Sequence, residues 1–455
     1  ETVSAIDLDG NNLIGDFSGD FSGFNSLTRL DLYDNQIYGD LGEIIALLPN
    51  GLTELYLGVN QIGGVIPAAL LNFSQLEWLN LTDNLISGDI VAAVDNLPAG
   101  LRGIWLDLNY LSGTIPASIS KFTSLIALDL SYNSLSGDWA AIQAALPNGM
   151  EWIGLGLTNL SGTIPESLAA NHPDLLVLDL AYNNLTGTLP LSLGDLLYLA
   201  VLWVNDNLLE GPVPIEYTHL PLNSFYFDNT SLCEPYLPSF DTWLAGIPYV
   251  GRTNTPCMTC STQTDVPELE CEALVTFFES TNGPDWSETY LWGVEPAVCT
   301  WYGISCETGH VTEINFRDAA STGNGLSGTL PAEIGDLTEL KYFDIYYAQV
   351  GGTVPQELFN LQKLEHLSLR ANAFSGQLPA DTSNLLALSI LKLGRNNFEG
   401  PFPTQLLSIP TLTQLRIGEN QFAGEIPAEI GNMSQLQWLS LGYNCLLYTS
   451  DAADE

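Results

Sequence analysis

Basic residues are scarce in this sequence of 455 residues, which has 11 Lys and Arg against 53 Asp and Glu and a formal net charge of −42. Such a chain lacks the basic face that neutralises phosphates, which excludes non-specific nucleic-acid binding and adsorption to anionic lipid. No run of 18 apolar residues occurs, so we expect no membrane span in this sequence.

Catalytic motifs are also missing. The four histidines, at positions 172, 219, 310 and 366, are scattered without metal-ligand spacing, and no G-x-S-x-G, H-E-x-x-H or P-loop sequence occurs. Pairs of carboxylates abound, but among 53 acidic residues a pair carries no information. We therefore expect no enzyme activity, no cofactor and no metal.

A repeat runs through almost the whole chain instead. The stretch ALLPNGLTELYLGVNQIGGVIP (46–67) contains the phrase L-x-x-L-x-L-x-x-N-x-I-x-G-x-I-P, and the phrase returns every 24 or 25 residues. Such a period and pattern predict an α/β solenoid of leucine-rich repeats, a horseshoe or superhelix whose parallel strands line a concave face. The asparagine position of the phrase is filled by Asn11, Asn35, Asn60, Asn84, Asn109, Asn133, Thr158, Asn183 and Asn207, then by Asn324, Ala348, Asn372, Asn396, Asn420 and Asn444.

This asparagine both donates and accepts hydrogen bonds, so it can satisfy backbone groups where each coil leaves the sheet. Thr158 can do part of that work and Ala348 cannot, so we expect a water or a distorted turn at Ala348. A second phrase, LPNGL (48–52), returns at 97–101 and 146–150, every 49 residues. Alternate coils of the first array should therefore differ in their convex connections.

The ending G-x-I-P, as in GTIP (113–116 and 162–165) and GTLP (187–190 and 328–331), resembles the plant-type leucine-rich repeat subfamily. Receptor-kinase ectodomains, receptor-like proteins and polygalacturonase-inhibitor-like proteins belong to it. FYFDNTSLCEP (225–235) resembles the C-terminal cap of that subfamily, and residues 280–314 resemble its N-terminal cap. The resemblance implies that Trp286, Trp292 and Trp301 cover an open end of the second core.

A helix is expected just before those tryptophans. Asp265 is its predicted N-cap and Pro267 lies in its first turn. The expected apolar face consists of Leu269, Leu274, Phe277 and Phe278.

The repeats and caps divide the chain into two tandem arrays with cysteine-containing caps. We expect a first array at 1–232 without its N-terminal cap, a C-terminal cap and connector at 233–264, an N-terminal cap at 265–308, and a second array at 309–444. Residues 3–6 align with residues 311–314, the first coil after a cap, so the sequence predicts a fragment of a longer tandem protein, truncated at both ends. CLLYTSDAADE (445–455) resembles a translated sequencing adapter, and we expect that it does not belong to the protein.

Six cysteines remain when Cys445 is set aside, an even number in a chain of extracellular type. The cap resemblance implies a Cys299–Cys306 disulfide, and we expect Cys233 to pair with Cys257 and Cys260 with Cys271. The C-x-x-C at 257–260 also suits zinc or redox chemistry, but no second C-x-x-C or nearby His cluster supports zinc. Six N-x-S/T sequences fit a secreted or cell-surface glycoprotein: Asn72, Asn80, Asn159, Asn184, Asn229 and Asn432.

Ligand binding by a solenoid takes place on its exposed concave strip. In the first array that strip is aromatic and acidic, which suits a sugar, a cationic peptide or a basic protein surface. The alternative is that neighbouring rings stack and stabilise the sheet. The candidate ligand-binding residues are Tyr56, Trp78, Trp105, Asp129, Trp152, Asp179 and Trp203.

In the second array the strip is basic. Of the seven Lys and Arg from residue 263 onward, six fall on it, which predicts an anionic partner. The partner is an acidic or sulfated polysaccharide, an acidic peptide, or the acidic face of another copy, in a contact that can propagate. The candidate residues are Arg317, Lys341, Tyr342, Tyr346, His366, Arg370, Lys392, Arg395, Arg416 and Trp438.

These patterns predict a non-catalytic ligand-binding protein of the cell surface or exterior, a receptor-like ectodomain that recognises glycan, peptide or protein. The alternatives are a multi-module adhesion or structural protein, an enzyme inhibitor and a receptor-kinase ectodomain, since the fold alone does not choose among them.

Overall fold

The chain is described by a computed structural model that covers residues 3–317 and 323–447. Two compact units fold within it: Glu1–Glu234 with Thr242–Thr255, and Pro235–Asp241 with Pro256–Glu455. Each unit contains one series of repeats and is described here by itself.

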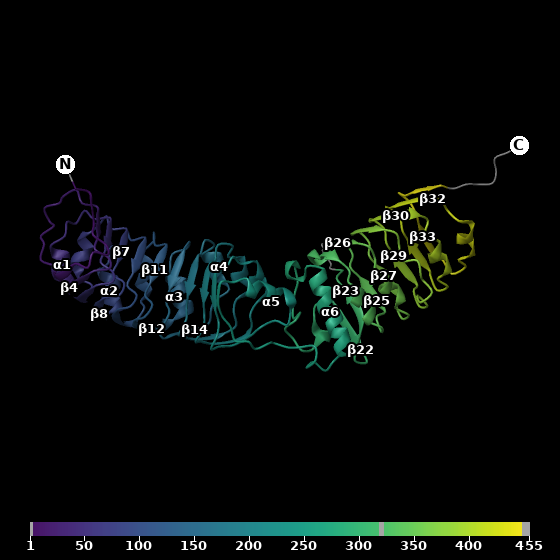
Figure 1. Cartoon of the computed structure of the whole chain (residues 1–455), viewed down its shortest axis with the longest axis horizontal. Coiled ribbons are helices and arrows are strands. Elements are labelled where there is room, and N and C mark those ends of the chain that lie inside the picture. Colours follow the sequence, from purple (N-terminus) through teal and green to yellow (C-terminus); the bar gives the residue numbers. More distant parts are fainter. Residues whose placement is uncertain (1–2, 318–322, 448–455) are drawn as a thin grey trace. The chain divides into compact units, whose positions relative to one another are not determined.

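An eleven-stranded parallel sheet, the concave sheet of the first unit, lines one face of its coils (Figure 1). Each strand has three residues, of which the middle one points inward, so that Leu30, Leu55 and Leu79 lie opposite one another in the core. The strands are β1 (Ala5–Asp7), β3 (Arg29–Asp31), β5 (Glu54–Tyr56), β7 (Trp78–Asn80), β9 (Gly103–Trp105), β11 (Ala127–Asp129), β13 (Trp152–Gly154), β15 (Val177–Asp179), β17 (Val201–Trp203), β19 (Ser224–Tyr226) and β21 (Tyr249–Gly251).

A second parallel sheet of ten strands follows the turn of each coil. Its strands are β2 (Ile14–Asp16), β4 (Gln36–Asp40), β6 (Gln61–Gly64), β8 (Leu85–Asp89), β10 (Tyr110–Thr114), β12 (Ser134–Asp138), β14 (Leu160–Gly162), β16 (Asn184–Gly187), β18 (Leu208–Pro212) and β20 (Ser231–Cys233).

The convex connections of the first unit explain the 49-residue period. Three α-helices precede the LPNGL-type phrases: α1 (Leu41–Ala46), α2 (Ile90–Asn96) and α3 (Trp139–Ala145). Each begins after an aspartate, Asp40, Asp89 or Asp138, whose side chain accepts a backbone N–H of the first turn. Other coils carry shorter helices: η1 (Ala68–Asn72), η2 (Ala117–Lys121), α4 (Ser167–Asn171), η3 (Leu191–Asp195) and η4 (Ile215–His219).

Most asparagines of the ladder bind the backbone as predicted, but Asn324 Nδ2 donates to the Glu288 carbonyl of the cap (3.0 Å), and its buried Oδ1 has no partner among the described residues. Asn109 Nδ2 donates to the carbonyls of Leu81, Leu106 and Asp107 (2.9–3.2 Å), and its Oδ1 accepts the Ile86 N–H (2.9 Å). Thr158 Oγ1 donates to the Leu155 carbonyl (2.6 Å), a part of the same work. At Ala348 a hollow of about 270 Å³ opens beside Leu326 and Gln349, with room for the expected water.

The second unit repeats this plan with a seven-stranded and a six-stranded sheet. Its concave sheet starts with an antiparallel pair, β22 (Ile304–Glu307) and β23 (His310–Asn315), and continues in parallel. The remaining concave strands are β25 (Tyr342–Asp344), β27 (His366–Ser368), β29 (Ile390–Lys392), β31 (Gln414–Arg416) and β33 (Trp438–Ser440). The other sheet contains β24 (Ser327–Thr329), β26 (Gln349–Gly352), β28 (Ala373–Gly376), β30 (Asn397–Pro401), β32 (Gln421–Glu425) and β34 (Cys445–Leu447).

The strand β34 lies in the segment that resembles a sequencing adapter. It pairs in parallel with β32, so residues 445–447 continue the ladder, whereas residues 448–455 lie outside the described residues. The short helices of the second unit are η5 (Gly283–Asp285), η6 (Val298–Thr300), η7 (Gly323–Gly325), η8 (Ala332–Asp336), η9 (Gln356–Asn360), η10 (Thr404–Ser408) and η11 (Ala428–Asn432).

A cap of aromatic rings closes the core of the second unit next to β22, as the resemblance implied. Trp292 lies 4.9 Å from Trp301 and 5.2 Å from Trp286, between ring centroids. Phe277 and Phe278 of α6 (Glu268–Ser280) pack against the same cluster. A further helix, α5 (Pro238–Ala245), precedes it in the chain.

Two details of the predicted helix are wrong. The helix α6 begins after Pro267, and Asp265 is not its N-cap, because Asp265 Oδ2 accepts the Cys299 N–H (2.8 Å) instead. Leu269 is 59% exposed, since five residues of helix before Leu274 turn it away from the face of Leu274, Phe277 and Phe278.

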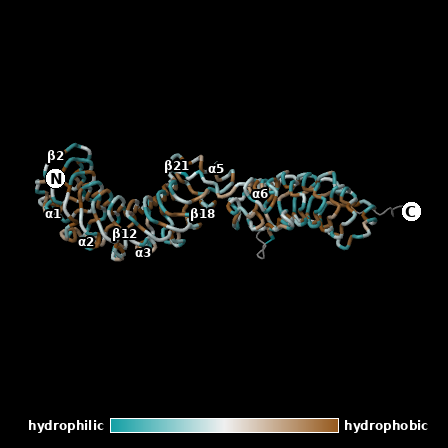
Figure 2. Tube along the Cα trace, turned by 90° about the horizontal axis from the view of Figure 1, so that it is seen from below, coloured by the Kyte–Doolittle hydropathy of each residue, from teal (hydrophilic) through white to brown (hydrophobic). Residues whose placement is uncertain are grey.

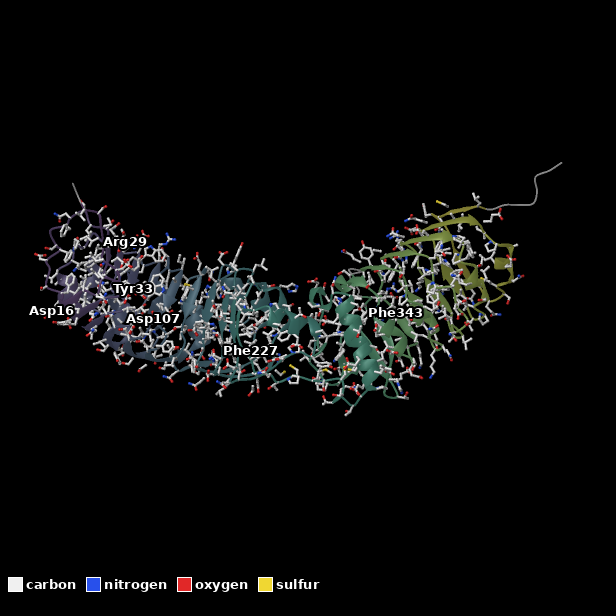
Figure 3. All side chains as sticks on the ribbon, viewed as in Figure 1. Asp16, Arg29, Tyr33, Asp107, Phe227 and Phe343 are labelled. Carbon is white, nitrogen blue, oxygen red and sulfur yellow. A yellow bond between two sulfur atoms is a disulfide. The ribbon has the colours of Figure 1, made fainter. Side chains whose placement is uncertain are left out.

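Disulfides join Cys260 to Cys271 and Cys299 to Cys306. Cys233 and Cys257 are also in the disulfide-bonded state, and their mutual pairing stays a prediction. Apolar residues alternate with polar ones along every coil (Figure 2), and the apolar ones, such as Phe227 and Phe343 (Figure 3), form the core of each unit.

Candidate ligand-binding groove

A column of polar residues crosses the concave sheet of the second unit. Parallel pairing sets Asp344, Ser368, Lys392, Arg416 and Ser440 side by side on successive strands from β25 to β33. These are the last residues of their strands, and they project to the same side because the middle residue of each strand points into the core. The repeat thereby brings together residues that lie 24 positions apart.

Beside this column lies a groove of about 440 Å³, hereafter the basic groove. Two residues after each of Lys392, Arg416 and Ser440 stands a glycine, so no side chain fills this part of the face. The lining residues are Arg317, Asp344, Tyr346, Ser368, Arg370, Lys392, Gly394, Arg416, Gly418, Glu419, Trp438, Ser440, Gly442 and Tyr443.

Aromatic rings hold three of the guanidinium groups. The Tyr346 ring lies between Arg317 and Arg370, whose Cζ atoms are 5.8 and 5.3 Å from its centroid, and Arg370 Nη1 donates to the Tyr346 hydroxyl (3.1 Å). Arg416 Cζ lies 4.4 Å from the Trp438 centroid. Such contacts fix the planar cations before any ligand arrives.

A buried acid lies under the cations. Asp344, which is 1% exposed, accepts the Tyr346 N–H (3.0 Å) and the Tyr342 hydroxyl (3.3 Å). Burial raises the pKa of Asp344, and burial followed by the charge of Asp344 raises the pKa of Tyr342 to about 12. Asp344 therefore helps to hold the strand ends rather than to form a close ion pair with Lys392.

Lys392 lies among like charges. Burial lowers its pKa first; Arg416, Arg317 and Arg370 lower it further, and Asp344 opposes them. His366, 3.4 Å from Lys392 Nζ, stacks on Tyr342 with 4.3 Å between centroids. Burial and the neighbouring cations lower the pKa of His366 to about 4, so the ring is neutral at pH 7.

The sequence-predicted basic strip divides into two groups. Arg317, Tyr346, Arg370, Lys392, Arg416 and Trp438 all line the basic groove. Lys341 instead forms an ion pair with Glu307, and Arg395 Nε donates to Glu419 (2.7 Å). Tyr342 and His366 stack on each other at the first positions of β25 and β27 and are not lining residues. Sequence reasoning missed Gly394, Gly418 and Gly442, although each stands two positions before the ladder asparagine of its coil.

The strip of the first unit is shaped by rings that pack against one another. Trp78 and Trp105 stack at 5.9 Å, and a side chain at Gly103 would meet both rings at about 2.5 Å, so glycine is needed beneath them. A smaller hollow of about 240 Å³ lies beside Tyr56, near Arg29 and Tyr33, which Figure 3 labels on this unit. Trp203 Nε1 donates to Ser224 Oγ (2.7 Å).

Three aspartates of this strip are not fully solvated. Asp129 accepts from Trp152 Nε1 (3.1 Å), and Asp179 accepts the Ala181 N–H (3.0 Å). Burial raises the pKa of Asp107 to about 6 and that of Asp179 to about 7, and it also raises the pKa of Asp129. The stacked rings stabilise the sheet in the way that the alternative interpretation expected, and ligand binding by this strip stays a prediction.

Other candidate features have simple placements. Five of the six sequon asparagines are exposed, and Asn80, on β7, is half-buried. Within residues 3–317 and 323–447, no helix is both long and apolar enough to cross a membrane. The same residues contain no cluster of three or more His, Cys, Asp or Glu arranged to hold a metal ion.

Comparisons with known proteins agree with the repeat. The family model described as Leucine Rich Repeat matches residues 174–196. A leucine-rich repeat receptor protein kinase of Oryza sativa subsp. japonica, MSL1, is 40% identical over 68 residues, which are 15% of this chain and 5% of the kinase. This chain therefore corresponds to only a small part of that relative.

Among solved structures, a TDR receptor is 23% identical to this chain at a TM-score of 0.47. The match covers 98% of this chain and 64% of the receptor chain. The plant peptide hormone receptor RGFR1, solved in complex with RGF2, is 26% identical at 0.44, with coverage of 96% of this chain and 58% of the receptor. The Leptospira interrogans leucine-rich repeat protein LIC12759 is 22% identical at 0.40, with coverage of 98% and 91%.

Parallel three-residue strands, the asparagine ladder and the aromatic cap are all present in coils of 24 or 25 residues, and both sequence matches are to leucine-rich repeat proteins. The chain therefore folds as a solenoid of leucine-rich repeats.

Proposed function

We propose that this chain is a non-catalytic, extracellular, receptor-like ectodomain whose basic groove binds an anionic ligand. The plant receptor kinase that it matches over 68 residues supports a receptor-like role at the cell surface. The two bonded cysteine pairs support an oxidising exterior, and the sequon asparagines are the proposed glycan sites.

The concentration of cations in the groove carries this proposal. Of the 11 Lys and Arg in the chain, four line the basic groove: Arg317, Arg370, Lys392 and Arg416. Within the described part of the chain, no carboxylate lies at ion-pair distance from Arg370, Lys392 or Arg416. A partly buried cation without a carboxylate at ion-pair distance gains free energy when an anion binds it, so this cluster favours an anionic ligand.

Charge reversal in the full chain tests the proposal. The variant Arg370→Glu/Lys392→Glu/Arg416→Glu should bind dextran sulfate or polygalacturonate at least about tenfold more weakly, a loss of ~1.4 kcal/mol or more. Lys363→Glu is the control, because Lys363 lies outside the groove and forms an ion pair with Glu339. Equal binding by the triple variant and the wild type, measured by calorimetry in ~0.1 M salt, contradicts the proposal.

Self-association is a second candidate, favoured by the acidic strip of the first unit, on which Asp34 and Asp83 are exposed. If a groove takes the acidic strip of another copy, the sedimentation coefficient should rise with protein concentration at low salt. The triple variant should then remain monomeric under the same conditions. A concentration-independent coefficient for the wild type eliminates this role and leaves soluble ligands.

A further inference from the structure

We infer that the ligand of the basic groove is a linear acidic polysaccharide, lying across strands β27, β29, β31 and β33 with its sugar units following the coils. This inference rests on the proposed function and specifies its ligand class.

The lining contains no aliphatic side chain. It consists of cations, hydroxyls, three aromatic rings, two acids and three glycines. Peptide ligands usually gain specificity from apolar pockets that take alternate side chains, and none is present here. A sugar acid instead needs hydrogen-bond partners and cations, which are the groups that this groove offers.

The cations follow the spacing of strands. Lys392 and Arg416 lie in register on adjacent strands, so their Cα positions are about 4.8 Å apart, whereas Arg370 stands two residues beyond the end of β27 and is level with Gly394. Side chains on one face of an extended peptide repeat at about 6.7 Å, which does not match this spacing. One anionic group of a polysaccharide can contact Lys392 and Arg416 together, because a single strand spacing separates them.

The backbone carbonyls of the three glycines that line the groove are hydrogen-bond acceptors, which carboxylate side chains cannot use. The carbonyls of Gly394, Gly418 and Gly442 each accept one backbone N–H, from Ala371, Arg395 and Glu419, and each carbonyl retains a second lone pair. Sugar hydroxyls can donate to such carbonyls and to Ser368 and Ser440. The side chains of an acidic peptide only accept.

The free groove also contains an unsatisfied donor. Arg416 Nη2 donates to Gln414 (3.0 Å), but its buried Nε has no partner among the described residues. A buried N–H without a partner costs about 1–3 kcal/mol. An oxyanion bound between Arg416 and Lys392 offsets the like charges of Arg416, Arg317 and Arg370, which add to burial in lowering the pKa of Lys392.

The test uses the full chain and defined probes in calorimetry: oligogalacturonate, a sulfated oligosaccharide, a neutral oligosaccharide of the same length, and an oligo-glutamate of the same charge. Gly442→Gln fills the groove without changing its charge, and a Cβ at Gly442 meets no atom within 4 Å. Gly431→Gln is the matched control, because Gly431 is equally open but lies on η11, outside the groove.

We expect at least one acidic oligosaccharide to bind at least tenfold more tightly than oligo-glutamate and the neutral sugar. Gly442→Gln should weaken that binding at least tenfold, and Gly431→Gln should not. The stronger of the two acidic sugars identifies uronate or sulfate as the anionic group.

Tighter binding of oligo-glutamate, or equal binding by Gly442→Gln and the wild type, overturns the polysaccharide inference. The proposed function still stands in that case if the triple charge reversal abolishes the binding that remains. Failure of every anionic probe to bind overturns both.

Discussion

Buried aspartates occur on the concave faces of both units, with different surroundings. Asp344 is 1% exposed, and the charges of Lys392 and Arg317 act on it and partly oppose the rise of its pKa on burial. Asp179 is 8% exposed, and Asp129 is its nearest charged influence, which opposes ionisation. A charge that is buried without a cationic partner destabilises the fold, so Asp179 should make stability depend on pH.

The pKa of Asp179 is about 7 in the fold and near 3.8 in the unfolded chain. Between these values the folded state binds the proton more strongly, so this group lowers stability as pH rises from about 4 to about 7. Asp179→Asn keeps the acceptor for the Ala181 N–H and removes the titration. The variant should match the wild type near pH 4 and exceed its free energy of unfolding by roughly 2–4 kcal/mol at pH 8.

Urea unfolding at several pH values measures this difference. Asp195→Asn, at an exposed carboxyl of η3, is the control for loss of one negative charge. A constant difference between Asp179→Asn and the wild type across pH 4–8 contradicts the assignment.

At the scale of the element, the indole ring of Trp292 is central to the packing of the cap of the second unit. Trp292 is 1% exposed, packs between Phe278 and Trp301, and donates its Nε1–H to the Tyr302 carbonyl (3.0 Å). Without this ring the last apolar layer of the core has no neighbour.

Trp292→Ala should destabilise the second unit by about 3–5 kcal/mol, because it leaves a large cavity in the cap. Hydrogen exchange of the α6 amides reports the loss locally, and it should accelerate in the variant. Tyr290→Ala in the same cap serves as the control, since Tyr290 is 66% exposed. Unchanged exchange in α6 after Trp292→Ala shows that the ring does not hold the cap.

The sequence predicts these elements well where a residue type has one physical role. Ladder asparagines, inward leucines and cap tryptophans are such residues, and the structure places them as expected except for Asn324, which donates to Glu288 of the cap. The prediction that Asp265 caps α6 is wrong because an aspartate near a helix start can accept several different backbone N–H groups. Here it accepts the N–H of Cys299. The charge pattern of the sequence predicted the basic strip, but it did not distinguish Arg395, which forms an ion pair, from Arg416, which does not. The partner of Arg395 is Glu419, 24 residues further along the chain, and the sequence alone does not reveal that contact.

At the scale of the whole molecule, short-range attraction and long-range repulsion both act on an anionic ligand at the basic groove. Four cations attract an anionic ligand at short range, while a net charge of −42 repels it at long range. The Debye length is about 30 Å at 0.01 M salt and about 8 Å at 0.15 M. At low salt the acidic surface therefore reaches a ligand at the groove, and at moderate salt only the nearby cations do.

This competition predicts that affinity for an acidic oligosaccharide passes through a maximum as salt increases. Between ~0.01 and ~0.1 M NaCl, screening of the distant acids should strengthen binding, and above ~0.2 M, screening of the groove cations should weaken it. Calorimetric titrations with one probe at a series of salt concentrations test this, and a neutral oligosaccharide gives the baseline. A monotonic fall in affinity from the lowest salt upward shows that the groove cations alone set the field at the ligand, and that the acidity of the chain does not act on recognition.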